Sequence, residues 1–234
     1  MNIGVFCYNF NHWKTQQGII NLCMSKNKPK VIFAADPIEL KFYRSKIRIT
    51  PKDLNLIHPK DIADYFDIDY FVVKHNSKQT NNLVKEYDLD LGIILGARIL
   101  KPIAYENFKK GVINMHPGIL PINRGLDNIK WAIIKNYEQG VTSHLIDRKI
   151  DQGYEIIKKT INVYRDDTLL DIHFRIQNLE QELMIESIDF LKNNDVEKLK
   201  KIEKGNYYKC VPPEVEKNLM VSFEKYKEQH ACDN

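Results

Sequence analysis

The sequence predicts an α/β protein built on a doubly wound, mostly parallel β-sheet. In the first half of the chain, short apolar runs alternate with amphipathic stretches, which is the sequence form of successive βαβ units. The apolar runs have the length of strands that are covered on both faces. With 234 residues, the chain is long enough to bury a sizeable core.

The predicted elements of the first half follow one another as strand and helix. The strands are expected at residues 2–8, 30–35, 70–74, 91–95 and 111–115, with helices at about 12–25, 79–87 and 103–109. Pro102 stands at the start of the last of these helices, where its fixed backbone angle suits the first helical turn. Segment 42–67 predicts an additional strand at 46–50 and a helix at 61–66 after Pro59.

The second half has a different order. A Pro-rich loop leads to a helix at about 127–136, and strands are expected at 140–146 and 154–163. A long helix then begins at the caps Asp166, Asp167 and Thr168, because apolar residues recur at helical spacing after them. We expect one domain over residues 1–195, and a short Lys/Glu-rich C-terminal extension, residues 196–234, which is too small to fold alone and packs on that domain.

Composition excludes several classes of protein. The net charge of +4 is spread along the chain, which argues against a nucleic-acid partner. No window reaches the roughly 18 apolar residues of a membrane span, and the N-terminus lacks a basic region and a cleavage site, so we expect a cytoplasmic protein. The four cysteines lack metal-ligand spacing, and we expect no metal site.

The residues with the clearest chemical potential are Asn114 and His116. They lie at the carboxyl end of a predicted strand, where doubly wound sheets bind ligands, and their spacing of two puts both side chains on one face. An amide beside an imidazole can stabilise an oxyanion, and Asp151 could orient the imidazole. The alternative is that Asn114 and His116 cap a strand and Asp151 belongs to a turn.

The wider pattern resembles the folate-dependent formyltransferase family. Residues 114–125 read N-x-H-P-G-x-L-P-x-x-R-G, and after a helix with Trp131 come G-V-T-x-H (140–144) and D-x-G (151–153). The resemblance implies a Rossmann-like sheet with formyltransferase topology and a catalytic triad of Asn114, His116 and Asp151. Gly118 departs from the family, in which Ser is more frequent there.

The resemblance also implies the formyl donor, 10-formyltetrahydrofolate, and the residues around it. Upstream similarity in DLDLGIILGARIL (88–100) implies that the donor binds at Arg98, Ile99 and Leu100, together with Asp147. We expect Leu120, Pro121, Arg124 and Gly125 to shape a loop over the site, with Arg124 paired with an acid. His144 is expected to support the site without reacting. The implied reaction is acyl transfer to an amine, with neither a metal nor a covalent intermediate.

The acceptor amine is less clearly indicated. A glycinamide ribonucleotide transformylase would carry a Gly-rich phosphate loop after its first strand, but no glycine occurs there before Gly18. Methionyl-tRNA formyltransferases are longer and more basic. The chain most resembles sugar N-formyltransferases, which implies a dTDP-linked amino-deoxysugar such as dTDP-4-amino-4,6-dideoxyglucose, a role in O-antigen and lipopolysaccharide biosynthesis, and a homodimer. A purine-type transformylase or a catalytically inactive folate- or nucleotide-binding regulator remain as alternatives.

A nucleotide-linked acceptor needs an aromatic surface for the base and cations for the diphosphate. The candidates are Asn9, Phe10, Trp13, Lys74, His75, Asn76, Tyr207 and Tyr208. Each has a structural alternative: the tyrosines could anchor the extension, Trp13 could pack on a helix face, and Lys74 could be solvated.

Overall fold

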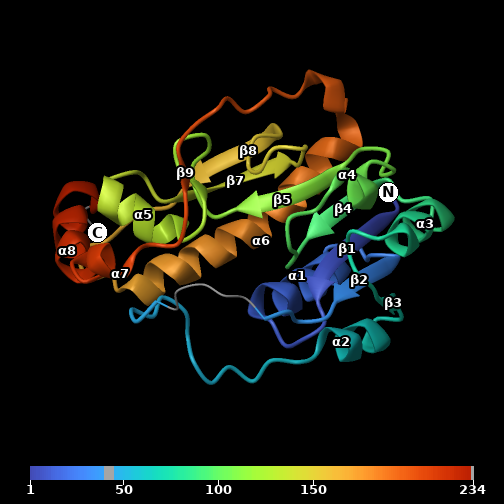
Figure 1. Ribbon diagram of the computed structural model, residues 1–234, viewed down its shortest axis with the longest axis horizontal. Helices are drawn as coiled ribbons and strands as arrows, with labels where there is room; N and C mark the ends of the chain where they lie inside the picture. The colour runs from blue at the N-terminus through green and yellow to red at the C-terminus, as the bar shows by residue number, and fades with distance from the viewer. Residues whose placement is uncertain (40–44, 233–234) are drawn as a thin grey trace.

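The computed structural model describes residues 1–39 and 45–232 (Figure 1). Within them, seven strands form one twisted sheet in the order β3-β2-β1-β4-β5-β7-β8. They are β1 (Ile3–Tyr8), β2 (Val31–Ala35), β3 (Asp69–Val72), β4 (Leu91–Ile94), β5 (Val112–His116), β7 (Gly140–Leu145) and β8 (Tyr154–Thr160). The first five are parallel and the last two antiparallel. The predicted fold class is confirmed.

The strand order reverses at β1, because β1 pairs with β2 on one side and with β4 on the other. The chain therefore leaves the carboxyl ends of these strands in opposite directions and opens a crevice there. Strands β4 and β5 continue the sheet toward the second half, with Ile94 beside Asn114. The carboxyl edge thus has one half at β3-β2-β1 and another at β5-β7-β8, separated by β4.

Helices cover both faces of the sheet (Figure 1). Side chains of α1 (Trp13–Met24), α2 (Pro59–Tyr65) and α6 (Leu169–Asn193) join the larger apolar core. Those of α3 (Lys78–Glu86) and α4 (Pro102–Tyr105) join a second core on the other face. The predicted start of α6 is confirmed by a capping box, in which the hydroxyl of Thr168 accepts from the N–H of Asp171.

The structure differs from the predictions in several places, and β8 ends at Thr160, whereas the strand was expected to continue to residue 163. No strand forms at residues 46–50; Ile47 and Ile49 pack against the larger core from an irregular segment, so their alternation reflects burial without strand pairing. Residues 42–44 of the same segment lie outside the described part of the chain. The helix at 103–109 is shorter than predicted, since α4 ends at Tyr105 and Phe108 turns into the second core.

The C-terminal residues pack on the rest of the protein. Strand β9 (Tyr207–Tyr208) pairs with β6 (Arg124–Gly125). After the 3-10 turn Val196–Lys198, this part of the chain holds α7 (Pro213–Glu216) and α8 (Leu219–His230), and α8 contacts α5 (Asn128–Lys135). A buried ion pair, Lys130 Nζ to Glu216 Oε1 at 2.7 Å, joins α5 to α7. The division at residue 195 stays a prediction. No helix in the described ranges has the length and apolarity to span a membrane.

Candidate active site

The three predicted catalytic residues lie together at the carboxyl edge of the second half. Asn114 and His116 are on the same face of β5, and Asp151 is in the loop that joins β7 to β8. Strand β7 runs antiparallel to β5, with His144 opposite Asn114 and Thr142 opposite His116. The sheet therefore brings residues that are far apart in the sequence into one site.

His116 is held between a carbonyl and a carboxylate. Its Nε2 donates to the backbone oxygen of Asn123 at 2.8 Å, and its Nδ1 lies 3.5 Å from Oδ1 of Asp151. His116 is buried, with 3% of its surface exposed. A ring that is protonated on both nitrogens suits this arrangement, because an Nδ1 lone pair would face the carboxylate. The 3.5 Å separation is that of an ion pair and is too long for a strong hydrogen bond.

Asn114 is oriented by the buried His144. The amide Nδ2 of Asn114 donates to Nε2 of His144 at 3.3 Å, while Nδ1 of His144 donates to the carbonyl of Leu145 at 3.2 Å. These bonds assign the neutral form of His144. Burial, reinforced by the nearby ring of His116, lowers the pKa of His144 to about 4. His144 therefore acts as a neutral acceptor that fixes the amide of Asn114.

The loop after His116 closes around the site. Leu120 N–H donates to Oγ1 of Thr142 at 3.1 Å, and the peptide between Leu120 and Pro121 is cis. Arg124 is buried, and its guanidinium donates to the backbone oxygens of Ile150 and Gly205. Among the described residues, Arg124 thus pairs with neutral backbone carbonyls, and the expected pairing with an acid is not observed. The N–H of Gly125 donates to Oδ2 of Asp151 at 2.9 Å.

The predicted donor residues lie on two loops. Leu100 is buried in the second core, whereas Ile99 is 65% exposed. Asn76 ties this loop down: its Nδ2 donates to the oxygen of Ile99 at 2.9 Å, and its Oδ1 accepts from the N–H of Lys101 at 2.7 Å. Asp147 begins the other loop, where its Oδ1 accepts from the N–H of Lys149 at 2.7 Å.

One buried hydroxyl on α4 has no partner among the described residues. It belongs to Tyr105. Burial, with an added contribution from the carboxylate of Asp147, raises the pKa of this phenol. Tyr105 packs against the second core, and Ile99 and Ile150 are exposed side chains on the two loops.

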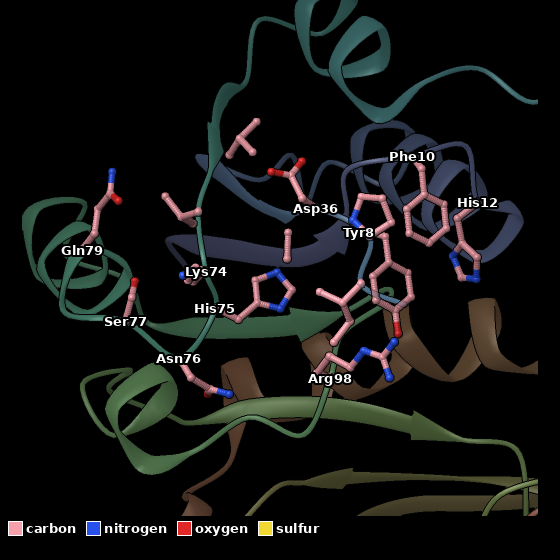
Figure 2. A pocket seen from close by; sticks show the side chains of 15 residues that line it. Tyr8, Phe10, His12, Asp36, Lys74, His75, Asn76, Ser77, Gln79 and Arg98 are labelled. Atoms are coloured by element: carbon pink, nitrogen blue, oxygen red, sulfur yellow. The ribbon is translucent and has the colours of Figure 1, made fainter. Parts of the chain in front are cut away.

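A cleft of about 930 Å³ opens beyond the first half of the carboxyl edge (Figure 2). Its walls come from the ends of β1, β2 and β3 and from the loop that carries Arg98. The lining residues labelled in Figure 2 are Tyr8, Phe10, His12, Asp36, Lys74, His75, Asn76, Ser77, Gln79 and Arg98. The rings of Tyr8 and Phe10 stack with centroids 4.9 Å apart.

The cleft contains some of the predicted acceptor residues. Phe10, Lys74, His75 and Asn76 line it, together with Arg98, which the sequence had assigned to the donor. Asn9 lies beside it and links the strand ends. Its Nδ2 donates to Oδ1 of Asp36 at 2.7 Å, and its Oδ1 accepts from the hydroxyl of Tyr70 at 2.7 Å.

Other predicted acceptor residues lie elsewhere. Trp13 packs on α6, with its ring centroid 5.6 Å from that of His173. Tyr208 stacks on Trp131 at 4.8 Å and shares a hydrogen bond with the hydroxyl of Tyr137, as an anchor of the C-terminal segment would. Tyr207 is exposed over the guanidinium of Arg124. These three side chains are not part of the cleft lining.

Sequence reasoning missed Tyr8 and Asp36 in the cleft. Both stand at strand ends, and Asp36 directly follows β2, so the rule that placed Asn114 could have found them. It also missed Lys14, whose Nζ donates to the carbonyl of Met115 at 3.0 Å and to the buried carboxylate of Glu180 at 2.7 Å. The described ranges hold no group of three or more His, Cys, Asp or Glu side chains that could bind a metal ion. A metal-free site stays a prediction.

Comparison with known proteins gives a match over more than half of the chain. The family model described as formyl transferase matches residues 54–188. The methionyl-tRNA formyltransferase of Flavobacterium psychrophilum is 28% identical over 188 residues, which cover 76% of this chain and 55% of that protein. The enzyme of the same name from Flavobacterium johnsoniae is 26% identical over 184 residues, 78% of this chain and 53% of that protein. The chain thus spans about half the length of these curated relatives.

Solved structures agree in fold. A phosphoribosylglycinamide formyltransferase from Bacillus halodurans superposes with a TM-score of 0.64 at 20% identity, covering 83% of this chain and 96% of that one. A 4-N formyltransferase from Francisella tularensis also superposes with a TM-score of 0.64, at 19% identity, covering 96% of this chain and 87% of that one. At these identities the similarity establishes the fold alone.

Proposed function

The chain belongs to the formyl transferase family, a family of enzymes, and from this premise we propose that it transfers a formyl group from 10-formyltetrahydrofolate to the amino group of a nucleotide-linked amino sugar. The observation that carries the choice of acceptor is the cleft at the ends of β1, β2 and β3, which combines stacked aromatic rings, cations and a carboxylate. The most suitable acceptor is a dTDP-linked amino-deoxysugar, with dTDP-4-amino-4,6-dideoxyglucose as the first choice, for O-antigen and lipopolysaccharide biosynthesis.

In this proposal the triad acts on the carbonyl and on the proton. The amide of Asn114 donates to the oxygen that becomes negative when a neutral amine attacks the formyl carbon. The Nε2–H of His116, which donates to the carbonyl of Asn123 in the free protein, exchanges that partner for the same oxygen while Nδ1 stays beside Asp151. Asp151 stabilises the charged ring and helps to move the proton from the amine toward the departing folate nitrogen. His144 keeps one amide hydrogen of Asn114 occupied, so the amide cannot rotate freely.

The donor supplies the formyl group when it is bound. The residues that the family resemblance assigns to the donor are Arg98, Ile99, Leu100 and Asp147, and Asn76 holds the loop of the first three in place. Arg98 is then available to the acceptor as well, because it lines the cleft.

The cleft has the chemistry that a nucleoside diphosphate requires. The exposed edge of the Tyr8–Phe10 stack offers a surface to a base. Lys74 and Arg98 can bind phosphate oxygens, and the carboxylate of Asp36, fixed by Asn9, can accept hydrogen bonds from ribose or sugar hydroxyls. A simple monophosphate would use only part of this lining.

The span of the edge also favours an elongated acceptor. Lys74 follows β3, and β3 is four strand spacings from β5, which carries Asn114. With about 4.8 Å between neighbouring strands, the separation is roughly 19 Å. A ligand that contacts Lys74 and reacts at Asn114 must bridge this length, as an extended nucleotide sugar does.

Methionyl-tRNA is the second candidate acceptor, because the curated relatives reported above carry that name. Glycinamide ribonucleotide is a third. The test is a panel with 10-formyltetrahydrofolate and dTDP-linked 4-amino and 3-amino sugars, a UDP-linked amino sugar, glycinamide ribonucleotide and methionyl-tRNA, read by mass for the gain of one formyl group. We expect the highest kcat/KM with a dTDP-linked sugar. Faster transfer to methionyl-tRNA would reject the sugar as the acceptor, whereas the proposal that the protein transfers a formyl group would still hold.

We also propose, from the same resemblance, a cytoplasmic homodimer. Light scattering on the purified protein is expected to give twice the chain mass of 27.5 kDa. A value equal to one chain would reject the dimer without affecting the assignment of the triad.

A further inference from the structure

One segment of the chain, residues 200–210, lies against both loops that surround the triad. It follows α6 and the 3-10 turn and runs between the loop that bears Asp151 and the loop after His116. The backbone hydrogen bonds that hold it are Glu155 N–H to Lys200 O (2.9 Å), Ile202 N–H to Gly153 O (2.9 Å), Arg124 N–H to Asn206 O (3.1 Å) and Leu126 N–H to Tyr208 O (2.9 Å). Residues distant in the sequence thereby connect the two loops.

Two glycines allow the backbones to approach this closely. A Cβ at Gly125, where φ is +102°, would clash with the carbonyl oxygen of Tyr208. A Cβ at Gly205 would clash with the carbonyl oxygen of Pro121. Because only glycine fits at both crossing points, the contact depends on the sequence at those points and is not an accidental surface contact.

Arg124 makes the side-chain link across the same crossing. One end of its buried guanidinium donates to the backbone oxygen of Ile150, and the other donates to that of Gly205 at 3.1 Å. Ile150 immediately precedes Asp151, and the N–H of Gly125 donates to the Asp151 carboxylate at 2.9 Å. Arg124 and Gly125 therefore hold Asp151 through its preceding peptide and through its side chain.

Asp151 needs such support. Its φ of +51° lies in the left-handed region, which residues other than glycine adopt rarely and at an energetic cost. Its carboxylate must nevertheless stay beside Nδ1 of His116, where the two groups are 3.5 Å apart. A loop that carried Asp151 without external contacts would not keep this geometry.

We infer that Arg124 is a positioning residue which, with residues 200–210, fixes the carboxylate of Asp151 relative to His116. It acts through Asp151 and so makes the C-terminal segment part of the catalytic unit. This inference rests on the proposed role of Asp151 in formyl transfer.

A double-mutant cycle tests whether Arg124 acts through Asp151. Arg124→Gln is expected to lower kcat about 10- to 100-fold, with KM for donor and acceptor changed less than about 3-fold, because a misplaced group impairs the reaction more than binding. In an Asp151→Asn background, Arg124→Gln is expected to cost less than about 3-fold. Lys225→Ala, a change at an exposed lysine of α8 outside residues 200–210, is the matched control and should leave kcat unchanged. If the double variant shows a loss of kcat equal to the product of the two single losses, Arg124 does not act through Asp151 and the positioning role is overturned.

The crystal structure of the Arg124→Gln protein gives a readout that needs no acceptor. We expect Asp151 Oδ1 to lie farther than 3.5 Å from His116 Nδ1, and an unchanged separation overturns the inference. Arg124→Lys, which keeps the charge but cannot reach both carbonyls, is the second variant if the first does not fold, and it should show the same displacement to a smaller degree. Failure of the unmodified protein to formylate any acceptor would count against the proposed function, and the structural comparison would still decide the role of Arg124.

Discussion

The two halves of the carboxyl edge are built differently. At β5-β7-β8 the triad is enclosed: His116 and His144 are buried, Asp151 is held by backbone and side-chain contacts, and residues 200–210 cross the loops. At β3-β2-β1 the edge opens into a cleft, where Lys74, Asn76 and Asp36 are exposed. One half is fixed by the protein itself, and the other leaves its charged groups in solvent.

The difference separates chemistry from recognition. Stabilising a developing charge requires donors that are already in position, because reorganising them during the reaction would cost free energy. Recognising a charged, extended ligand can rely on side chains that become ordered when the ligand binds. The enclosed half should therefore control kcat and stability, whereas the open half should control the KM of the acceptor.

The largest effect is expected in the enclosed half. His116→Ala should lower kcat by about 10²- to 10⁴-fold, because it removes a proton donor and the partner of Asp151. Circular dichroism should be unchanged, and acceptor binding by calorimetry should stay within about 3-fold. Near-normal turnover in this variant would remove His116 from the mechanism and, with it, the contrast between the two halves.

The enclosed half should also depend on the docking of α7. Glu216→Ala is expected to lower the free energy of unfolding by about 3–5 kcal/mol, since it leaves the Lys130 ammonium buried without its 2.7 Å partner. Urea denaturation measures this change. Glu214→Ala changes an exposed residue of the same short helix and is the control; its free energy of unfolding should stay within about 0.5 kcal/mol of the wild-type value. Equal values for the two variants would show that the buried pair does not stabilise this half.

The pH dependence of stability should distinguish the halves further. Because the pKa of His144 is lowered to about 4 in the folded protein, the unfolded state binds more protons between pH 6.5 and pH 4. The contribution of neutral His144 is present above about pH 6.5 and is lost as the pH falls toward 4, by roughly 3 kcal/mol at most.

Urea titrations across this window provide the measurement. His144→Gln should flatten the fall in stability toward pH 4. His12→Gln should flatten it less, although the pKa of His12 is also lowered to about 4 by burial, because His12 is partly exposed at the cleft and solvent screens its charge. A curve for His144→Gln parallel to that of the wild type would contradict the neutral state assigned to His144.

The smallest effect is expected in the open half. Lys74→Ala should raise the acceptor KM by about 5- to 30-fold with little change in kcat, because it removes an interaction made equally before and during the reaction. Lys78→Ala, an exposed lysine on the neighbouring helix outside the cleft lining, is the matched control. If both changes alter KM equally, general charge rather than the cleft attracts the acceptor.

Prediction from sequence was most successful where a motif coincides with a strand end. The rule for the carboxyl ends of parallel strands places Asn114 and His116, which lie at the end of β5. It does not place Asp151, because β7 is antiparallel to β5 and the loop after β7 starts at the amino end of β5; only the motif grouped Asp151 with His116, and the two side chains do lie 3.5 Å apart. Aromatic residues were harder to assign. Trp13 and Tyr208 are packed against α6 and Trp131, and a single sequence does not reveal which partner covers an aromatic ring.

The C-terminal segment shows the limit more clearly. Its composition predicts an appendage, yet its backbone bonds cross the loops of the triad. Those contacts depend on two glycines and one arginine whose partners lie far away in the sequence, so no local sequence pattern predicts them. Register between distant segments is set by tertiary packing, and this is also why the alternation at residues 46–50 did not become a strand.

The crossing of the triad by residues 200–210 also has a consequence for synthesis on the ribosome. Residues 114, 116 and 151 emerge well before the segment that fixes their loops, and chains fold from the N-terminus as they are made. The strands of the cleft can be complete while the loop with Asp151 still lacks its support. In a nascent chain the cleft at β1, β2 and β3 can therefore form before residues 200–210 hold the loop that carries Asp151.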